Sequence, residues 1–147
     1  MAGETIRKVT EEFYVAPQLR PEDFEAAAAL GIKTVINNRP DGESADQLSD
    51  ETARRHAEAA GLAYAFVPVV SGHMTPTAIQ EFIATVDGAE GPVLAYCRSG
   101  TRSCFMWAFS AARSTPLEQV VAAAGRAGYD VSPALPVLER IASGELP

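Results

Sequence analysis

Two kinds of apolar segment alternate along the chain. Short runs rich in β-branched and aliphatic residues predict buried β-strands at residues 13–16, 32–37, 62–69 and 92–96. Longer alanine-rich or amphipathic segments predict helices at residues 20–31, 49–61, 75–86, 103–113, 115–128 and 132–142. Strands that are apolar throughout and alternate with helices are typical of a parallel sheet covered on both faces. We therefore expect an α/β fold with a central, mainly parallel sheet flanked by helices.

Helix boundary residues support this interpretation. Pro21 suits the first position of its helix, and Gly31 suits the stop that follows it. Thr75 is a natural N-cap before Pro76. Thr115 and Glu118 have the spacing of a capping box.

Length and charge narrow the class of protein. A chain of 147 residues with 47% hydrophobic residues fits one domain, residues 1–147, with a real core. The net charge of −7 argues against nucleic-acid or anionic-membrane partners. The first residues lack the apolar core of a signal peptide, and no apolar run approaches membrane-spanning length, so we expect a cytoplasmic protein.

The segment AYCRSGTRS, residues 95–103, places a thiol between two guanidiniums in a loop of small residues. Arg98 follows Cys97 directly, and Arg102 comes five positions after it. Cationic neighbours and an adjoining helix N-terminus favour the nucleophilic thiolate of a cysteine. We therefore expect Cys97 to be the nucleophile and Arg102 to be the planar fork that holds an anionic substrate.

The same loop predicts an anion-binding cradle. Its backbone turns between a strand and a helix, so that successive N–H groups point inward at a helix N-terminus. Gly100 permits the positive φ that such a turn needs. We expect Ser103 or Thr101 to hydrogen-bond the thiolate and Arg98 to orient the substrate. The expected anion-binding residues are Arg98, Ser99, Gly100, Thr101 and Ser103.

A second loop, NNRPDGE at residues 37–43, follows the predicted strand 32–37. Parallel strands end at the same edge of a sheet, which would bring this loop towards Cys97. Either Arg39 and Glu43 pair with each other and brace the rim, or Arg39 contacts the substrate. The candidate residues of this loop are Asn38, Arg39, Asp41 and Glu43.

The remaining thiol and the histidines carry weaker signals. Cys97 and Cys104 do not form a disulfide framework. Cys104 either resolves a Cys97 persulfide as a disulfide or, more simply, is a small core residue of the buried helix. His56 and His73 lie far apart without ligand spacing, so we expect neither a metal site nor a cofactor.

The motif CRSGTRS resembles the active-site loop of rhodanese-type sulfurtransferases. The segments around it resemble the phosphatase-like domain of the beta-lactamase-hydrolase-like protein family: FYVAPQL, GIKTVINNRPDGE, YAFVPVVSGHMT and GPVLAYCRSGTRS, in that order. The second resemblance spans most of the chain and implies the fold of the dual-specificity and tyrosine phosphatases.

Two features depart from the phosphatase pattern. Phosphatases of that fold carry five residues between the cysteine and the arginine, whereas Cys97 and Arg102 have four between them. An acidic residue that protonates the leaving group should follow the strand 62–69, but the chain there reads Val-Ser-Gly-His. His73 or Asp41 would have to take its place.

These departures lead us to expect a sulfurtransferase. Cys97 would take sulfane sulfur from thiosulfate or a small persulfide and pass it to a thiol, sulfite or cyanide. The alternative is a phosphatase that acts through a phosphocysteine at Cys97. A third possibility is a non-catalytic anion-binding module. The family resemblance further suggests a persulfide-oxidising partner protein.

Overall fold

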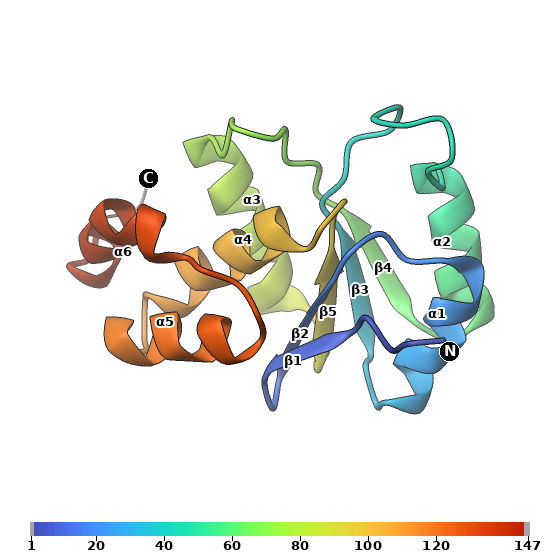
Figure 1. The fold of residues 1–147 in the computed structure, drawn as a ribbon, viewed down its shortest axis with the longest axis horizontal. Helices are drawn as coiled ribbons and strands as arrows, with labels where there is room; N and C mark the ends of the chain where they lie inside the picture. Colours follow the sequence, from blue (N-terminus) through green and yellow to red (C-terminus); the bar gives the residue numbers. More distant parts are fainter. Residues whose placement is uncertain (1, 146–147) are drawn as a thin grey trace.

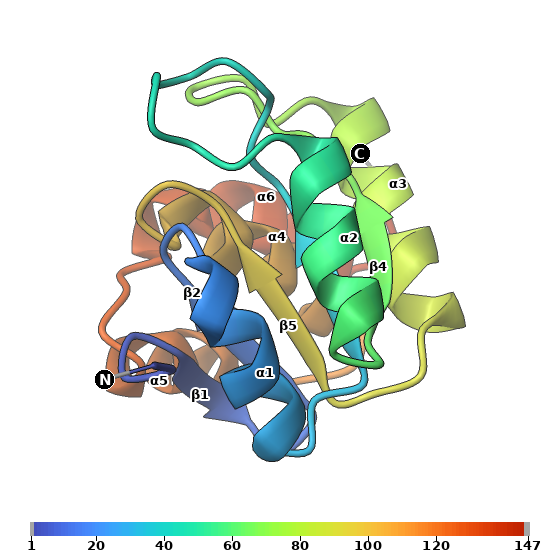
Figure 2. The ribbon, with the colours of Figure 1, turned by 90° about the vertical axis from the view of Figure 1, so that its right-hand side faces the viewer.

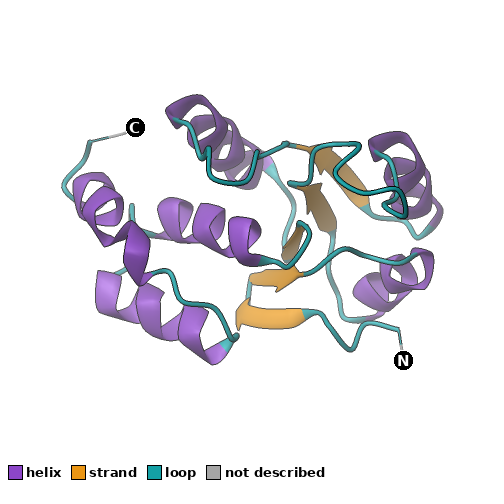
Figure 3. Cartoon of the chain, turned by 45° about the horizontal axis from the view of Figure 1, so that its top comes forward, coloured by secondary structure: helices purple, strands orange, loops and turns teal. Residues whose placement is uncertain are grey.

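The computed structural model describes residues 2–145 and shows a sheet between two groups of helices (Figures 1 and 3). The strands in the described part are β1 (Arg7–Thr10), β2 (Phe13–Ala16), β3 (Thr34–Asn37), β4 (Ala63–Phe66) and β5 (Val93–Tyr96). The helices are α1 (Pro21–Ala29), α2 (Asp50–Ala59), α3 (Pro76–Gly88), α4 (Thr101–Ala111), α5 (Leu117–Arg126) and α6 (Leu135–Ala142), with the 3-10 turn η1 (Ser132–Ala134) before α6.

The strands form one sheet in the order β1-β2-β5-β3-β4. The neighbouring strands β2, β5, β3 and β4 are parallel to one another, and only the edge strand β1 runs antiparallel. This confirms the expected mainly parallel α/β sheet. In register, Ala16 and Asn37 both lie opposite Tyr96, the last residue of β5. The loops after these strands therefore leave the sheet side by side, at the same edge (Figure 2).

Side chains at alternating strand positions belong to two hydrophobic cores, one on each face of the sheet. Ala16, Val35, Leu94 and Tyr96 pack with α1 and α2 on one face. The opposite face packs against α3, α4, α5 and α6, and Trp107 of α4 lies in this core (Figure 1). Burial of both faces explains why the strands read as continuous apolar runs.

Capping was predicted correctly for one of these helices and wrongly for another. Thr75 is the N-cap of α3, and its side chain accepts a hydrogen bond from the Ala78 N–H. The capping box expected from Thr115 and Glu118 does not form, because α5 begins one residue later, with Pro116 at the N-cap. The Thr115 N–H is instead bonded to the Ala111 carbonyl at the end of α4, 2.8 Å away.

Strand β1 was not predicted, and its composition explains why. Only Val9 of its four residues is buried, so RKVT carries no apolar run. Among residues 2–145, no helix has both the length and the apolar character needed to cross a membrane.

Candidate active site

Cys97 lies directly after β5, at the edge of the sheet where the parallel strands end. Its side chain is fully buried, and its N–H is bonded to the Ala16 carbonyl, 3.4 Å away, at the end of the neighbouring strand β2. Three residues then complete a tight loop before α4 begins at Thr101. The thiol therefore sits between the carboxyl end of a strand and the positive end of a helix.

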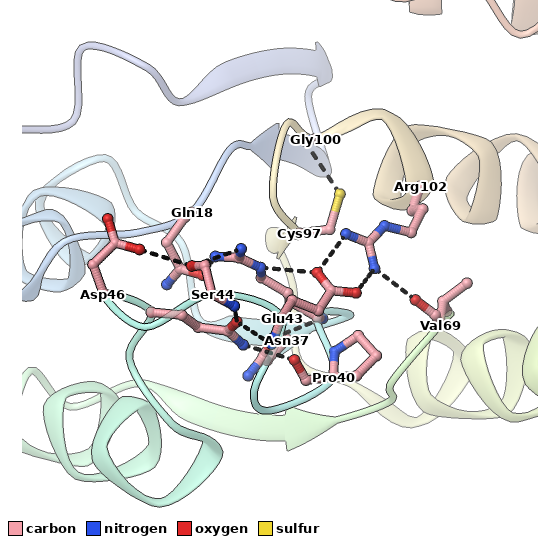
Figure 4. A network of polar contacts seen from close by, with 12 residues as sticks. Gln18, Asn37, Pro40, Glu43, Ser44, Asp46, Val69, Cys97, Gly100 and Arg102 are labelled. Atoms are coloured by element: carbon pink, nitrogen blue, oxygen red, sulfur yellow. Dashed lines mark hydrogen bonds and ion pairs between the residues drawn. The ribbon is translucent and has the colours of Figure 1, made fainter. Parts of the chain in front are cut away.

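The Ser99–Gly100 peptide is the part of the loop that hydrogen-bonds to the thiol. The Gly100 N–H donates to Cys97 Sγ at 3.2 Å (Figure 4). The Ser99 carbonyl, on the opposite side of the same peptide plane, accepts a hydrogen bond of 3.1 Å from the Tyr129 hydroxyl. Gly100 has φ of +93°, and a Cβ there would collide with the Tyr129 hydroxyl, so glycine is required on two counts.

Arg102, the second residue of α4, is almost buried and has a well-defined partner. Its Nη1 and Nη2 donate to the two carboxylate oxygens of Glu43 at 2.8 and 2.9 Å, and Nη1 also donates to the Val69 carbonyl at 2.8 Å (Figure 4). The Glu43 hydrogen bonds are the main cause of the raised pKa of Arg102, and the negative charge of Cys97 adds to it. Arg102 is therefore a cation in a fixed position, close enough to Cys97 for the two charges to interact.

The bonding of Arg102 leaves one edge of the guanidinium available. A guanidinium has five N–H donors, and Glu43 and Val69 take three of them. The remaining two are the Nε–H and the second Nη2–H, which lie on the same edge of the planar group. That edge is suited to receive two oxygens of a tetrahedral anion.

Glu43 connects this arginine to a second buried one. Arg39 Nε donates to Glu43 Oε1 at 3.0 Å, while its Nη1 and Nη2 donate to Gln18 and Ser44. Of the two alternatives for Arg39, the structure shows the pair with Glu43, and the same carboxylate also holds Arg102. Hydrogen bonds from Arg102 and then Arg39 lower the pKa of Glu43, although desolvation opposes the shift.

The hydroxyls of the loop do not bond the thiol as expected. Ser103 Oγ donates to Asn38 Oδ1 at 2.9 Å, and Asn38 Nδ2 donates to the Val67 carbonyl at 2.8 Å. Thr101 is exposed, and its hydroxyl accepts a hydrogen bond from Ser99 Oγ. Ser103 and Asn38 therefore tie the cysteine loop to the loops after β3 and β4.

In the described part of the chain, the two residues proposed as substitute acids do not hydrogen-bond to the cysteine or its arginine. Asp41 is exposed and accepts a hydrogen bond of 2.7 Å from the Asp50 N–H, at the start of α2. His73 is exposed in the turn after β4, where its N–H is bonded to the Val70 carbonyl. Neither side chain hydrogen-bonds to Cys97 or Arg102 among the described residues.

The second thiol, Cys104, behaves as a core residue. It is fully buried on α4, within the core that contains Trp107. Burial, with a smaller contribution from the charge of Cys97, raises the pKa of the Cys104 thiol to about 12. Tyr129 was not singled out from the sequence, because its partner, Ser99, is 30 residues away and no local pattern links them.

The parallel sheet, the buried cysteine after its central strand and the arginine in the first turn of the next helix define a cysteine-phosphatase-like fold. The chain belongs to the family described as beta-lactamase hydrolase-like protein, phosphatase-like domain, whose model matches residues 5–114.

Known relatives agree with this family. A beta-lactamase hydrolase-like protein of Xylella fastidiosa is 36% identical over 134 residues, which are 90% of this chain and 31% of that protein. The chain thus spans about a third of the length of the curated relatives it matches. A crystal structure of a candidate phosphatase from Neisseria meningitidis has 35% identity and a TM-score of 0.81, and the match covers 93% of this chain and 98% of that one. The core catalytic domain of the S. cerevisiae PP-IP phosphatase SIW14, with 17% identity and a TM-score of 0.72, shares the fold; the match covers 99% and 90% of the two chains.

The sulfurtransferase expectation is wrong. The family is phosphatase-like, and the two solved structures described above are named as phosphatases. The expectation depended on two local features: the four-residue spacing between Cys97 and Arg102, and the absence of an acidic residue after the predicted strand 62–69. In the structure the four-residue spacing still points a backbone N–H at Sγ and leaves a two-donor edge on Arg102, so spacing alone does not select sulfur over phosphate. The persulfide-oxidising partner loses its support with that activity.

Proposed function

We propose that this protein is a phosphatase that hydrolyses small phosphate monoesters through a phosphocysteine at Cys97. The observation that carries the proposal is the Gly100 N–H directed at Cys97 Sγ, 3.2 Å away, at the N-terminus of α4. A backbone donor in this position stabilises the thiolate before reaction. Amides of the same loop stabilise the oxygens of the transferring phosphoryl group.

The reaction follows in two steps. The Cys97 thiolate attacks phosphorus, the P–O bond to the leaving group breaks, and the leaving group departs as an oxyanion that solvent water then protonates. Water then attacks the phosphorus of the phosphocysteine, the P–S bond breaks, and inorganic phosphate leaves with the thiolate restored. In both steps the Nε–H and the free Nη2–H of Arg102 hold two of the equatorial oxygens.

The setting of the site supports a small, soluble substrate. Arg102 is 9% exposed and Cys97 is buried, which supports a substrate whose reacting end is small. The structural relative from S. cerevisiae is a PP-IP phosphatase seen in complex with citrate, a small polyanion. A free thiolate nucleophile also suits a reducing compartment such as the cytoplasm. The net charge of −7 disfavours nucleic-acid substrates.

Hydrolysis of p-nitrophenyl phosphate by the native protein and two variants tests the proposal. We expect Cys97→Ser to abolish turnover and Cys104→Ala, the matched control at the other buried thiol, to retain it. Intact-mass measurement after rapid acid quench should show one phosphoryl group on the native protein. Equal activity of Cys97→Ser and native protein would refute the proposal. Saturable phosphate binding without any turnover would indicate a non-catalytic anion-binding module.

A further inference from the structure

A second polar pocket lies beside the cysteine loop. It has a volume of about 230 Å³. The lining residues come from the loops after β2, β3 and β5, and they are Gln18, Arg39, Ser44, Asp46, Gln47 and Arg98. Every one of these side chains is polar, and two are guanidiniums, in a protein whose net charge is −7.

Internal hydrogen bonds fix the inner wall of this pocket. Arg39 is 3% exposed, and its guanidinium donates to Gln18 Oε1 at 2.9 Å and to Ser44 Oγ at 3.2 Å. Gln47 Oε1 accepts from the N–H groups of Glu43 and Ser44. A wall bonded in this way is preorganised and loses little entropy when a ligand binds.

Arg98 differs from the other arginine of the pocket. It is exposed, and its side chain makes no hydrogen bond or ion pair with another residue in the described part of the chain. The hydrogen bond from Ser44 is the main cause of the lowered pKa of Asp46 at the pocket rim. The positive charges of Arg39 and Arg98 lower this pKa further. The lining thus carries two positive charges against one negative charge.

The pocket is joined to the active site through covalent and polar links. Arg98 is the residue after Cys97, and its carbonyl accepts a hydrogen bond of 3.1 Å from the Gln18 N–H. On the other side, Glu43 bridges Arg39 of the pocket and Arg102 of the active site. A molecule whose phosphate reaches Cys97 therefore has this pocket as its immediate surroundings.

We propose that this pocket is a second anion subsite, which binds a carboxylate or phosphate group carried by the same molecule as the scissile phosphate. Arg98 supplies the free donors, and buried Arg39 supplies a fixed positive charge behind them. Asp46 opposes the second charge of a phosphate dianion, so a carboxylate should bind better than a phosphate. The proposal rests on the phosphatase function and specifies its substrate class as phosphate esters with a second anionic group.

A matched pair of substrates tests the subsite: an aryl phosphate with a tethered carboxylate, and its neutral amide. We expect Arg98→Ala to lower kcat/KM for the carboxylate about ten- to a hundredfold more than for the amide, the range for a charge-assisted hydrogen bond. Arg126→Ala is the control, because Arg126 is also exposed and lies at the end of α5, outside this pocket. A phosphate-tethered analogue in the same series measures the expected preference for carboxylate.

The outcomes separate this proposal from the function on which it rests. If Arg98→Ala slows both substrates equally, or neither, the subsite is absent although the protein remains a phosphatase. If the native protein hydrolyses neither substrate, calorimetric titration with the corresponding aryl phosphonates still measures the subsite. Selective loss of affinity for the carboxylated phosphonate in Arg98→Ala supports the subsite, and equal affinities overturn it.

Discussion

A single carboxylate, Glu43, holds two buried guanidiniums at the edge of the sheet. Arg39 and Arg102 are 3% and 9% exposed, and each donates to Glu43 within 3.0 Å. Burial of a charged group is costly unless it is paired, because an unpaired charge loses its hydration without compensation. Glu43 therefore compensates two cations and also sets which edge of Arg102 faces the substrate.

Replacing Glu43 by glutamine should damage both stability and activity. We expect Glu43→Gln to lower the free energy of unfolding by about 2 kcal/mol, the scale of hydrogen bonds to charged groups. The fall in kcat/KM should be larger than the change in KM, so kcat itself should fall, because Arg102 loses its fixed orientation. Urea denaturation and steady-state kinetics measure the two effects, and Glu11→Gln is the control because the Glu11 side chain is 86% exposed. Wild-type stability of Glu43→Gln would contradict this account.

The same residue makes a pH-dependent contribution to stability. The Glu43 pKa is lowered in the folded protein from an ordinary value of 4.5, chiefly by the Arg102 hydrogen bonds. The folded state thus prefers the ionised form, so the contribution is complete above pH 4.5 and is lost as the pH falls through the lower, folded pKa. We expect the stability difference between native protein and Glu43→Gln to be constant near neutral pH and to shrink in acid. A difference that grows in acid would contradict the assigned ion pairs.

At the residue scale, a contact within one loop was easier to predict from the sequence than a contact between loops. The Arg39–Glu43 pair was predictable because the two residues are four positions apart in one loop. The Arg102–Glu43 pair joins positions 59 apart and depends on which strands are neighbours in the sheet. Ser103 was one of two hydroxyls expected to bond the thiolate, from proximity in sequence, but the fold places Asn38 Oδ1 2.9 Å from its hydroxyl.

Between elements, the Tyr129 hydroxyl restrains the peptide that faces Cys97. Tyr129 follows α5, and its hydroxyl donates to the Ser99 carbonyl in the loop before α4. The carbonyl and the N–H of one trans peptide point in opposite directions. Holding the Ser99 carbonyl outward therefore keeps the Gly100 N–H directed inward at Sγ.

Removal of this hydroxyl should weaken the cradle without unfolding the protein. We expect Tyr129→Phe to lower kcat/KM about fivefold, the equivalent of one hydrogen bond of about 1 kcal/mol. The affinity for vanadate should fall in parallel, because the same peptide N–H serves a bound oxyanion. Tyr14→Phe is the control, since Tyr14 is a half-buried residue of β2. Unchanged vanadate affinity in Tyr129→Phe would show that the loop holds its geometry without this contact.

Elements were predictable where their residues were apolar on a regular pattern. Strands β2, β3, β4 and β5 are buried or partly buried and were found, whereas β1 has one buried residue and is defined by pairing with β2. The start of α5 was misplaced because Pro116, and not the side chain of Thr115, occupies the N-cap. These features depend on contacts between segments, which local composition does not report.

For the whole molecule, the arrangement of acidic groups bears on the chemistry. Three carboxylates follow β3, and each is engaged: Asp41 with the α2 backbone, Glu43 with two arginines and Asp46 with the Ser44 hydroxyl. Hydrogen bonds lower the pKa values of Glu43 and Asp46, which keeps both ionised at neutral pH. An ionised carboxylate accepts protons and does not donate them, so these two groups are poor general acids.

Turnover should therefore depend strongly on the leaving group of the substrate. A general acid contributes about a hundredfold to ten-thousandfold to such a reaction, and a site without one favours leaving groups that need no proton. We expect kcat/KM for aryl phosphates to fall steeply as the pKa of the phenol rises, and alkyl phosphates to be hydrolysed slowest. The measurement is a plot of log kcat/KM against phenol pKa for the native protein, with His73→Ala and Asp41→Asn as comparisons. A shallow slope in the native protein that becomes steep in either variant would identify that residue as the proton donor and contradict the prediction.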